Sequence, residues 1–201
     1  MKIISINKNK YGNTYKVFLE NDEEYNLSIE QIIKYKIKEN SEIDYEKFKE
    51  ILLEDNKREA FNKALDIISF KDNTTYEIEN KLYKKGYSDI IISDVIMKLK
   101  EYNFLDDNKY AQNYVNNCLM YKKYGKNKIV YMLKQKGIPS NIINNLIFDN
   151  DLEFETAKKL FDKKLLSLDK EDNNKKKEKL YRHLSGKGYS NEIIMKLLKN
   201  L

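Results

Sequence analysis

Hydrophobic and polar positions in most of this chain repeat at a fixed interval of 51 residues. In each copy an apolar stretch leads to Leu, then to Lys-Gly, and then to a second apolar stretch. The copies lie at Leu82–Ile92, Leu133–Ile143 and Leu184–Ile194, with glycines at Gly86, Gly137 and Gly188. A constant period of this length indicates a repeated supersecondary unit.

Each copy predicts one helix that ends at the glycine and a second helix that starts directly after it. Glycine suits the left-handed position that follows a helix, and the next residue, Tyr or Ile, supplies the hydrophobic contact of such an ending. Ser88 and Ser190 are favoured N-caps for the second helix, and Ser140 is expected to cap the middle copy after Pro139. Apolar residues then recur at helical spacing, namely Ile91, Ile92, Val95, Ile96 and Leu99 in the first copy and Ile142, Ile143, Leu146 and Ile147 in the middle copy.

A third helix is predicted ahead of these two in every copy, over 60–68, 111–119 and 157–165. The interval between the second and third of these helices is 46 residues rather than 51. The five missing residues reappear later, in the longer polar connection 169–177. Three short helices are enough to enclose a small core. We therefore predict a mostly α protein with three tandem, helix-turn-helix-like repeats at 56–106, 107–150 and 151–201, which form an elongated body.

Residues 1–55 predict a small β-rich extension in front of the repeats. Alternating apolar residues in 3–6, 15–19 and 21–27, with turns at Gly12-Asn13 and Asn21-Asp22, are typical of an antiparallel meander. Ser28 is expected to cap a short helix over 29–35. A second helix is expected from about Tyr45 to Leu53.

Composition limits the class of protein. No run approaches 18 apolar residues and the amino terminus lacks an apolar signal segment, so we expect a soluble, cytoplasmic protein without membrane contact. A single cysteine, Cys118, excludes an internal disulfide and is expected to be a small core residue.

Positive charge is concentrated in the middle repeat. Residues 107–150 hold 7 basic and 2 acidic side chains, whereas residues 1–55 hold 9 basic and 12 acidic ones. Lysines alternate with tyrosines here, a mixture that suits phosphate contacts and base stacking, although a lysine-rich helix end can equally be solvated surface. The candidate binding residues are Tyr121, Lys122, Lys123, Tyr124, Lys126, Lys128, Lys134 and Lys136.

Candidate catalytic chemistry is sparse. Asp106 and Asp107 precede a helix, where carboxylates cap free N–H groups and favour the positive end of the helix dipole. His183 has no cluster of metal-ligand residues at suitable spacing, and it lies 65 residues from the only cysteine. We therefore expect no enzyme activity, no cofactor and no metal site.

Several motifs resemble the RecX regulatory proteins, which act on the RecA recombinase. They are the Lys-Gly helix endings, Phe104–Asp107 followed by Tyr110-Ala111, and Tyr124–Ile129 leading to Gln135–Ile138. The chain departs from the family pattern at Thr74–Glu77, at Asn127 and in its longer lysine-rich connection. The resemblance covers essentially the whole chain.

This resemblance implies a monomer that lies along the groove of a RecA–DNA filament and limits its growth. It also implies inhibition of strand exchange, of ATP hydrolysis and of co-protease activity, and thus a role in homologous recombination, DNA repair and the SOS response. Contact with single- or double-stranded DNA would be weak or made through RecA. Two alternatives remain open from the residues: an independent DNA-binding protein, and a scaffold for other proteins.

Overall fold

The computed structural model describes residues 1–10, 14–199 and 201. The chain divides into two compact units, Met1–Arg58 and Glu59–Leu201, and each is described by itself. The turn predicted at Gly12 and Asn13 lies outside the described residues. Within the described ranges, the helices are too short or too polar to cross a lipid bilayer.

The first unit contains the predicted meander. Strands β1 (Ile3–Lys8), β2 (Thr14–Leu19) and β3 (Glu24–Ser28) form an antiparallel sheet in the order β1-β2-β3. Helix α1 (Ile29–Lys34) starts as predicted at Ser28, whose hydroxyl accepts a hydrogen bond from the Gln31 amide in a capping box. The core holds Ile3, Val17, Leu19 and Leu27 of the sheet with Ile37, Phe48 and Leu52.

Helix α2 (Tyr45–Phe70) is a single helix of 26 residues, so the predicted ending at Leu53 is wrong. No glycine or proline interrupts the polar stretch that follows Leu53. The side chain of Lys57 pairs with Glu54 and that of Arg58 with Asp55, each at 2.8 Å and three residues apart. Pairs at this spacing support the polar stretch that lies between the apolar residues Phe48 and Leu52 on one side and Ala60 and Ala64 on the other.

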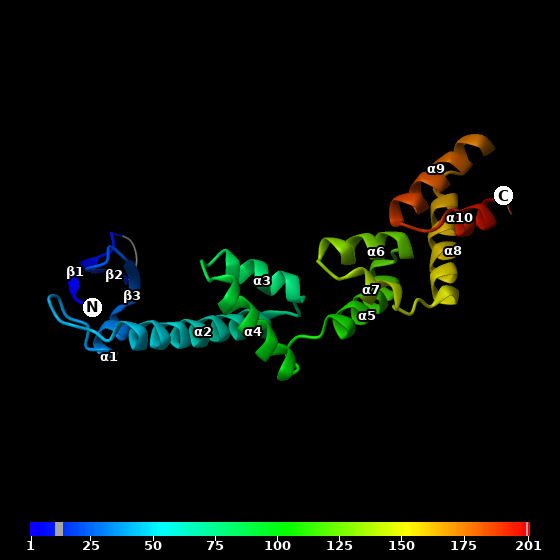
Figure 1. Ribbon diagram of the computed structural model, residues 1–201. Helices are drawn as coiled ribbons and strands as arrows, with labels where there is room; N and C mark the ends of the chain where they lie inside the picture. Colours follow the sequence, from blue (N-terminus) through cyan, green and yellow to red (C-terminus); the bar gives the residue numbers. More distant parts are fainter. Residues whose placement is uncertain (11–13, 200) are drawn as a thin grey trace. The chain divides into compact units, whose positions relative to one another are not determined.

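The second unit is helical throughout its regular elements and contains the three predicted repeats (Figure 1). The end of α2 is followed by α3 (Thr75–Tyr83) and α4 (Asp89–Glu101), and then by α5 (Asp107–Asn117), the π-helical turn η1 (Cys118–Lys122), α6 (Lys126–Gln135) and α7 (Ser140–Asn144). The last repeat comprises α8 (Asn150–Leu166), α9 (Asn173–Lys187) and α10 (Asn191–Leu198).

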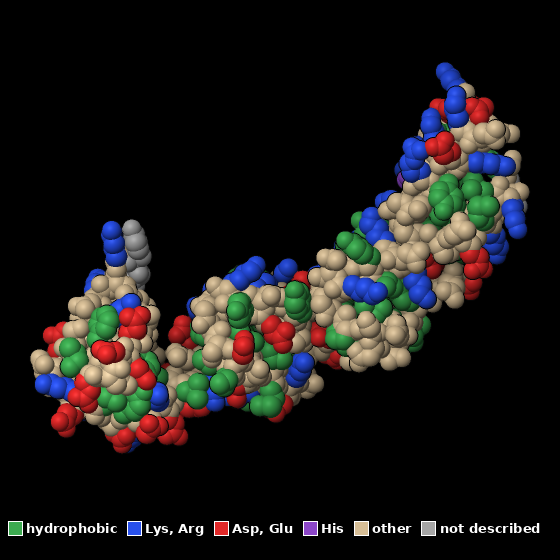
Figure 2. Space-filling model, turned by 45° about the horizontal axis from the view of Figure 1, so that its top comes forward, with side chains coloured by type: hydrophobic (Ala, Val, Ile, Leu, Met, Phe, Trp, Pro, Cys, Tyr) green, Lys and Arg blue, Asp and Glu red, His purple; other side chains and the backbone are tan. Residues whose placement is uncertain are grey.

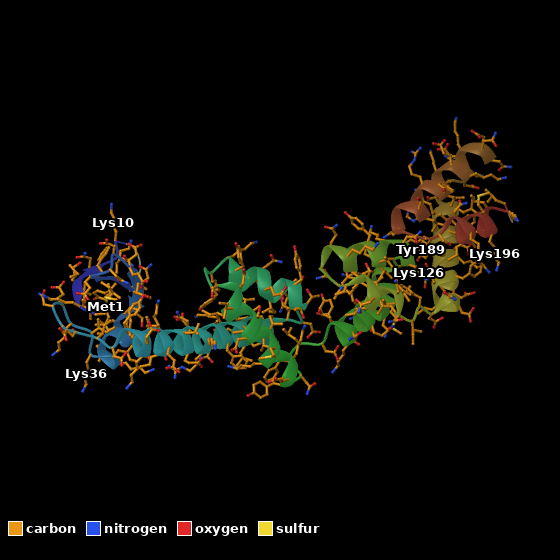
Figure 3. The ribbon with its side chains drawn as sticks, viewed as in Figure 1. Met1, Lys10, Lys36, Lys126, Tyr189 and Lys196 are labelled. Atoms are coloured by element: carbon orange, nitrogen blue, oxygen red, sulfur yellow. The ribbon has the colours of Figure 1, made fainter. Side chains whose placement is uncertain are left out.

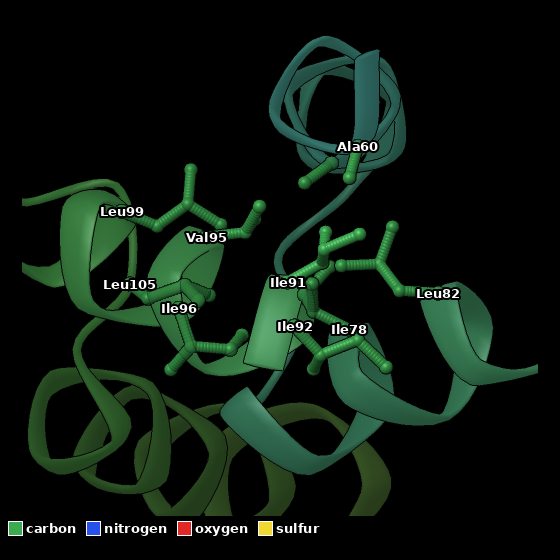
Figure 4. Packing of buried hydrophobic residues seen from close by; sticks show 10 residues of the cluster. Ala60, Ile78, Leu82, Ile91, Ile92, Val95, Ile96, Leu99 and Leu105 are labelled. Atoms are coloured by element: carbon green, nitrogen blue, oxygen red, sulfur yellow. The ribbon is translucent and has the colours of Figure 1, made fainter. Parts of the chain in front are cut away.

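Each repeat has its own hydrophobic core. In the first, Ile78 and Leu82 of α3 meet Ile91 and Val95 of α4 beneath Ala60 of α2 (Figure 4). Ala60, Ile78, Leu82 and Val95 are fully buried. In the middle repeat Cys118 is buried as expected, at the junction of α5 and η1.

The three predicted glycine endings are confirmed. Gly86, Gly137 and Gly188 have φ angles of 88°, 74° and 86°, the left-handed conformation that only glycine adopts readily. In every copy the amide after the glycine donates to the carbonyl of the repeated leucine; the pairs are Tyr87 to Leu82, Ile138 to Leu133 and Tyr189 to Leu184. This bond defines the Schellman ending of a helix.

The helices after these glycines differ in how they start. Ser190 caps α10 as predicted, because its hydroxyl accepts from the Ile193 amide at 3.3 Å. Ser88 occupies the cap position of α4 without a side-chain cap bond. Ser140 is already the first residue of α7 and Pro139 holds the cap position, so the predicted capping by Ser140 is wrong.

The second helix of the middle repeat is shorter than its apolar pattern suggested. Helix α7 ends at Asn144, and Ile147 is 76% exposed rather than part of a helical face. The side chain of Gln112 bonds both the amide and the carbonyl of Ile147, at 3.0 and 2.9 Å. Side-chain hydrogen bonds to the backbone here replace continued helix.

The start of α3 contacts the glycine ending of α6, which joins the first repeat to the second. The Thr74 hydroxyl donates to the carbonyl of Lys136 at 2.7 Å, and Thr74 is completely buried. The amide of Thr75 donates to a carboxylate oxygen of Asp107 at 2.9 Å. We call this contact the first joint.

The start of α6 contacts the glycine ending of α9 in the same way, and we call this contact the second joint. The Gly125 amide donates to the Lys187 carbonyl at 3.0 Å, and the Asn127 amide donates to the Gly188 carbonyl at 3.1 Å. Between them, the Lys126 amide donates to Glu153 at 2.7 Å. The third repeat thus satisfies amides at the start of α6 that have no partner within their own helix.

Glycine allows the backbones to come this close. A Cβ atom at Gly125 would lie 2.5 Å from the Gly188 carbonyl oxygen, although the φ angle of Gly125 is an ordinary −78°. Gly186, in the last turn of α9, has no such neighbour within 4 Å. The two glycines therefore separate the effect of close approach from the general effect of glycine on a helix.

Gly125→Ala is expected to lower the free energy of unfolding by about 1–3 kcal/mol, because the added methyl group overpacks the second joint. Gly186→Ala should instead raise it by about 0.5–1 kcal/mol, since alanine favours a helix interior. Urea unfolding followed by circular dichroism measures both. Equal effects of the two substitutions would show that Gly125 is not in close contact.

Candidate nucleic-acid interface

The predicted basic segment begins where the middle repeat departs from regular α-helix. Helix α5 continues into the π-helical turn η1, and Lys123 then adopts a left-handed conformation with φ 55°. Tyr121 is 78% exposed, as predicted, and Lys122 and Lys123 are exposed beside it. A π-helical turn and a non-glycine residue with positive φ are uncommon features that often mark functional sites.

Two lysines of the segment lie over aromatic rings. The ammonium group of Lys122 is 5.3 Å from the centre of the Tyr114 ring, and that of Lys126 is 4.9 Å from the centre of the Phe148 ring. Both lysine residues remain exposed. These rings hold the long side chains in position while the charged groups stay in contact with solvent.

Tyr124 and Lys128 belong to the second joint rather than to a free surface. Lys128 lies 4.5 Å above the Tyr124 ring, and its ammonium group donates to the carbonyl of Gly186 at 3.1 Å. Lys187 approaches the same ring at 5.4 Å. The side chain of Tyr124 is half-buried against the middle core, so only part of this candidate binding residue is open to solvent.

Buried Tyr189 closes the second joint. Its hydroxyl donates to the Lys123 carbonyl at 3.1 Å, and it lies beside Lys126 (Figure 3). Glu153 is also buried, at 4% exposure, and accepts the Lys126 amide. The backbone of the basic segment is thus fixed by the third repeat.

Lys136 belongs to the first joint. Its ammonium group is 2.8 Å from a carboxylate oxygen of Glu77 and lies over the rings of Tyr110 and Tyr114. Burial disfavours the charged form of Lys136, but hydrogen bonds to Glu77 and Tyr110 raise its pKa above the ordinary value. Burial likewise opposes ionisation of Glu77, yet its bonds with Lys136 and the Thr74 amide lower its pKa below 4.5.

The structure therefore sorts the predicted residues into two groups. The exposed group, which we call the basic segment from here on, consists of Tyr121, Lys122, Lys123, Lys126 and Lys134. The joint group is Tyr124, Lys128 and Lys136. Sequence reasoning missed the joint residues Thr74, Glu77, Glu153, Lys187 and Tyr189. The 51-residue period could have found some of them, because it relates Thr74 to Gly125 and Lys136 to Lys187.

The other predicted residues have structural surroundings. Asp106 caps α5 as expected, accepting from the amides of Asn108 and Lys109, whereas Asp107 reaches across to α3. Burial, and after it the charges of Lys164 and Lys187, lower the pKa of His183. In the part of the chain that the structure describes, His, Cys, Asp and Glu form no group of three that could hold a metal ion.

Basic side chains also gather on the third repeat, over α8, α9 and α10 (Figure 2). Together with the middle repeat, this gives two neighbouring three-helix units with excess positive charge. Fold and surface thus define a class: a tandem array of helix-turn-helix-like units with basic surfaces. Proteins with these features are typically built for binding.

Comparison with known families agrees with this class repeat by repeat. Residues 60–99, 106–146 and 151–198 match the sequence models of the first, second and third three-helix domains of RecX. The chain is 36% identical to the regulatory protein RecX of Clostridium perfringens strain SM101, over 99% of this chain and 97% of that protein. It is 38% identical to that of Clostridium botulinum strain Eklund 17B, over 91% and 87% of the two chains.

Solved structures show the same fold. A crystal structure of regulatory protein RecX aligns with a TM-score of 0.71 and 24% identity, over 100% of this chain and 99% of that one. RecX from Lactobacillus salivarius aligns with a TM-score of 0.69 and 28% identity, over 73% of this chain and 97% of that one. This chain belongs to the RecX family of regulatory proteins.

The Glu77–Lys136 pair of the first joint is expected to make the stability of the fold depend on pH. The pKa of Glu77 is lowered in the folded state, so its ionisation stabilises the fold above about pH 4.5, and this contribution disappears as the pH falls through the folded pKa. Glu77→Gln keeps the capping geometry but removes the charge. The variant should lose on the order of 1 kcal/mol at neutral pH and lack this part of the acid dependence.

Urea unfolding between pH 3 and 7, an interval set by the ordinary carboxylate pKa range, checks this expectation. Lys136→Met and the double variant complete a double-mutant cycle that isolates the pair from the surrounding contacts. A coupling energy of zero would mean that the Glu77–Lys136 pair does not hold the first joint.

Proposed function

We propose that this chain is a non-enzymatic regulator that binds RecA–DNA filaments and inhibits the recombinase, its ATP hydrolysis and its co-protease activity. Such a regulator modulates homologous recombination, DNA repair and the SOS response. Membership of the RecX family supports the proposal. We further propose that the protein acts in the cytoplasm as a monomer, without a cofactor.

The basic segment is the observation that carries the proposal. It combines exposed lysines with an exposed tyrosine, Tyr121, on an unusual π-helical and left-handed backbone. Because the fold maintains this backbone through bonds to Lys123 and Lys126, the segment is held in place before a ligand arrives. Lysines near an exposed ring suit the phosphates and bases of DNA in a filament.

The joints support binding to a polymer rather than to an isolated site. Hydrogen bonds to the backbone connect consecutive repeats, from the Thr74 hydroxyl at the first joint and from the Gly125 and Asn127 amides at the second, so these contacts fix how neighbouring repeats are spaced. A helical filament repeats its binding surface from one subunit to the next, and a tandem array suits such a target. The first 55 residues are acidic on balance and suit contact with protein instead.

RecA-dependent ATP hydrolysis on single-stranded DNA tests the proposal. Addition of the protein at amounts equal to RecA should inhibit hydrolysis strongly, because the bound regulator stops filament growth. Unchanged hydrolysis, with intact filaments in a sedimentation assay, would overturn the proposal. Selective binding to duplex DNA without RecA would favour an independent DNA-binding protein.

A matched pair of triple variants tests the basic segment. Replacing Lys122, Lys123 and Lys126 with Gln should raise the concentration needed for half-inhibition by about tenfold, since three exposed charge contacts contribute roughly 0.5 kcal/mol each. The control replaces Lys158, Lys159 and Lys163 of α8, which are also exposed and carry the same charge. Equal effects of the two triples would attribute binding to net charge and not to the basic segment.

A further inference from the structure

A second aromatic and basic surface lies in the first repeat, where α2 ends beside α3. Phe70, the last residue of α2, is 87% exposed, the largest exposure among the large hydrophobic residues that the structure describes. Together with Ile67 it lines a cleft of about 440 Å³ whose other lining residues are Lys71, Lys81, Lys84 and Lys85. We call these six residues the Phe70 patch.

The positive charge of the Phe70 patch is compensated only in part, by the nearby carboxylate of Glu77, which acts on Lys71 and Lys81. None of its four lysines forms a salt bridge with a residue that the structure describes. Lys81 donates to the side-chain oxygen of Asn73 at 2.8 Å, a neutral partner. Burial, and after it the charge of Lys71, lower the pKa of Lys81, which fits a locally positive potential.

The 51-residue period shows how the helix ending beside the Phe70 patch differs from the other two. Lys85 corresponds to Lys136 and Lys187, the lysines whose carbonyls accept hydrogen bonds at the two joints. Gly86 corresponds to Gly137 and Gly188, but a Cβ atom at Gly86 would meet nothing within 4 Å. The helix ending that is enclosed in the other two repeats is therefore open in the first.

We propose that the Phe70 patch binds single-stranded nucleic acid, with a base stacked on the Phe70 ring and the lysines placed on neighbouring phosphates. An exposed ring within an unpaired basic surface is the usual platform for unpaired bases. An acidic peptide would also attract the lysines, but a peptide anchor needs a walled pocket, whereas almost the whole Phe70 ring is open to solvent.

This inference goes beyond the proposed function, because it requires neither RecA nor the basic segment of the middle repeat. The Phe70 patch also lies in a region whose overall composition does not predict a basic surface. Residues 56–106 hold 9 basic and 9 acidic side chains. Their folding collects four of the lysines around one exposed phenylalanine.

Phe70→Trp provides a direct probe, because the chain contains no other tryptophan. Addition of an oligodeoxythymidine should quench the fluorescence of this tryptophan, since a stacked base contacts the indole ring. An abasic oligonucleotide of the same length should leave the intensity nearly unchanged. Absence of quenching by oligodeoxythymidine, or equal binding of a polyglutamate peptide, would overturn the proposal.

Binding of a fluorescein-labelled oligodeoxythymidine, followed by anisotropy without RecA, tests the residues. Phe70→Ala should weaken binding about 5- to 100-fold, the cost of one lost base stack, and Phe70→Leu should weaken it nearly as much because leucine lacks a π-face. Leu166→Ala is the control, since Leu166 also ends a helix and is 81% exposed. Equal binding by Phe70→Leu and the wild type would exclude stacking.

Salt dependence tests the lysines. Replacing Lys71, Lys84 and Lys85 with Gln should reduce the log–log slope of affinity against salt by about 2, as each phosphate contact on a single strand contributes roughly 0.7. An unchanged slope would remove these lysines from the site. Inhibition of RecA by a Phe70→Ala protein that no longer binds the oligonucleotide would leave the proposed function intact, so the two proposals can fail separately.

Discussion

The structure of the repeats depends on one contact, in which the start of a helix meets the glycine ending of a helix in the next repeat. A helix start has amides without partners and a helix ending has carbonyls without partners. At the second joint the two satisfy each other directly, whereas at the first joint the Thr74 hydroxyl is the donor to the Lys136 carbonyl. At the second joint the Gly125 amide donates to the Lys187 carbonyl at 3.0 Å, and Glu153 accepts the amide of Lys126. These polar contacts act beside apolar ones, since Leu152 of the third repeat packs against the core of the middle repeat and the Tyr76 side chain lies directly against Gly137.

Local features of this arrangement could be predicted from the sequence because their causes are local. A Lys-Gly step at period 51 predicts a left-handed glycine and a Schellman bond, and all three copies have them. The joints could not be predicted in the same way. Thr74 and Lys136 are 62 residues apart and both are polar, so hydrophobic periodicity carries no information about their contact. The continuity of α2 was missed for a related reason, since its linking stretch is stabilised by ion pairs and not by an apolar face.

Charge counts locate positive segments but do not show which lysines are free. The middle repeat has the largest excess of lysine, yet Lys128 and Lys136 form contacts within the chain. The first repeat is neutral by count, yet the fold places Lys71, Lys81, Lys84 and Lys85 together, and none of them forms a salt bridge with a described residue. The joints account for one part of this difference, because they occupy the side chains of Lys128 and Lys136 where two repeats meet, whereas Lys85, the counterpart of Lys136, lies at no joint.

The caps of the three equivalent helices show how the joints and the sequence compensate for one another. A carboxylate accepts an amide in the first turn of each helix: Asp107 at α3, Glu153 at α6 and Asp172 at α9. At α3 and α6 this carboxylate comes from the following repeat, whereas Asp172 belongs to α9 itself. Helix α3 also has a capping box of its own, formed by Thr74 and Glu77, so Asp107 adds to a local cap there. Helix α6 starts at Gly125 without a side-chain cap bond and depends on Glu153. At the opposite end of the series, the helix ending at Gly86 is not enclosed by a helix start from a preceding repeat, since an added Cβ atom would meet no described residue within 4 Å. Its lysines remain available for a ligand.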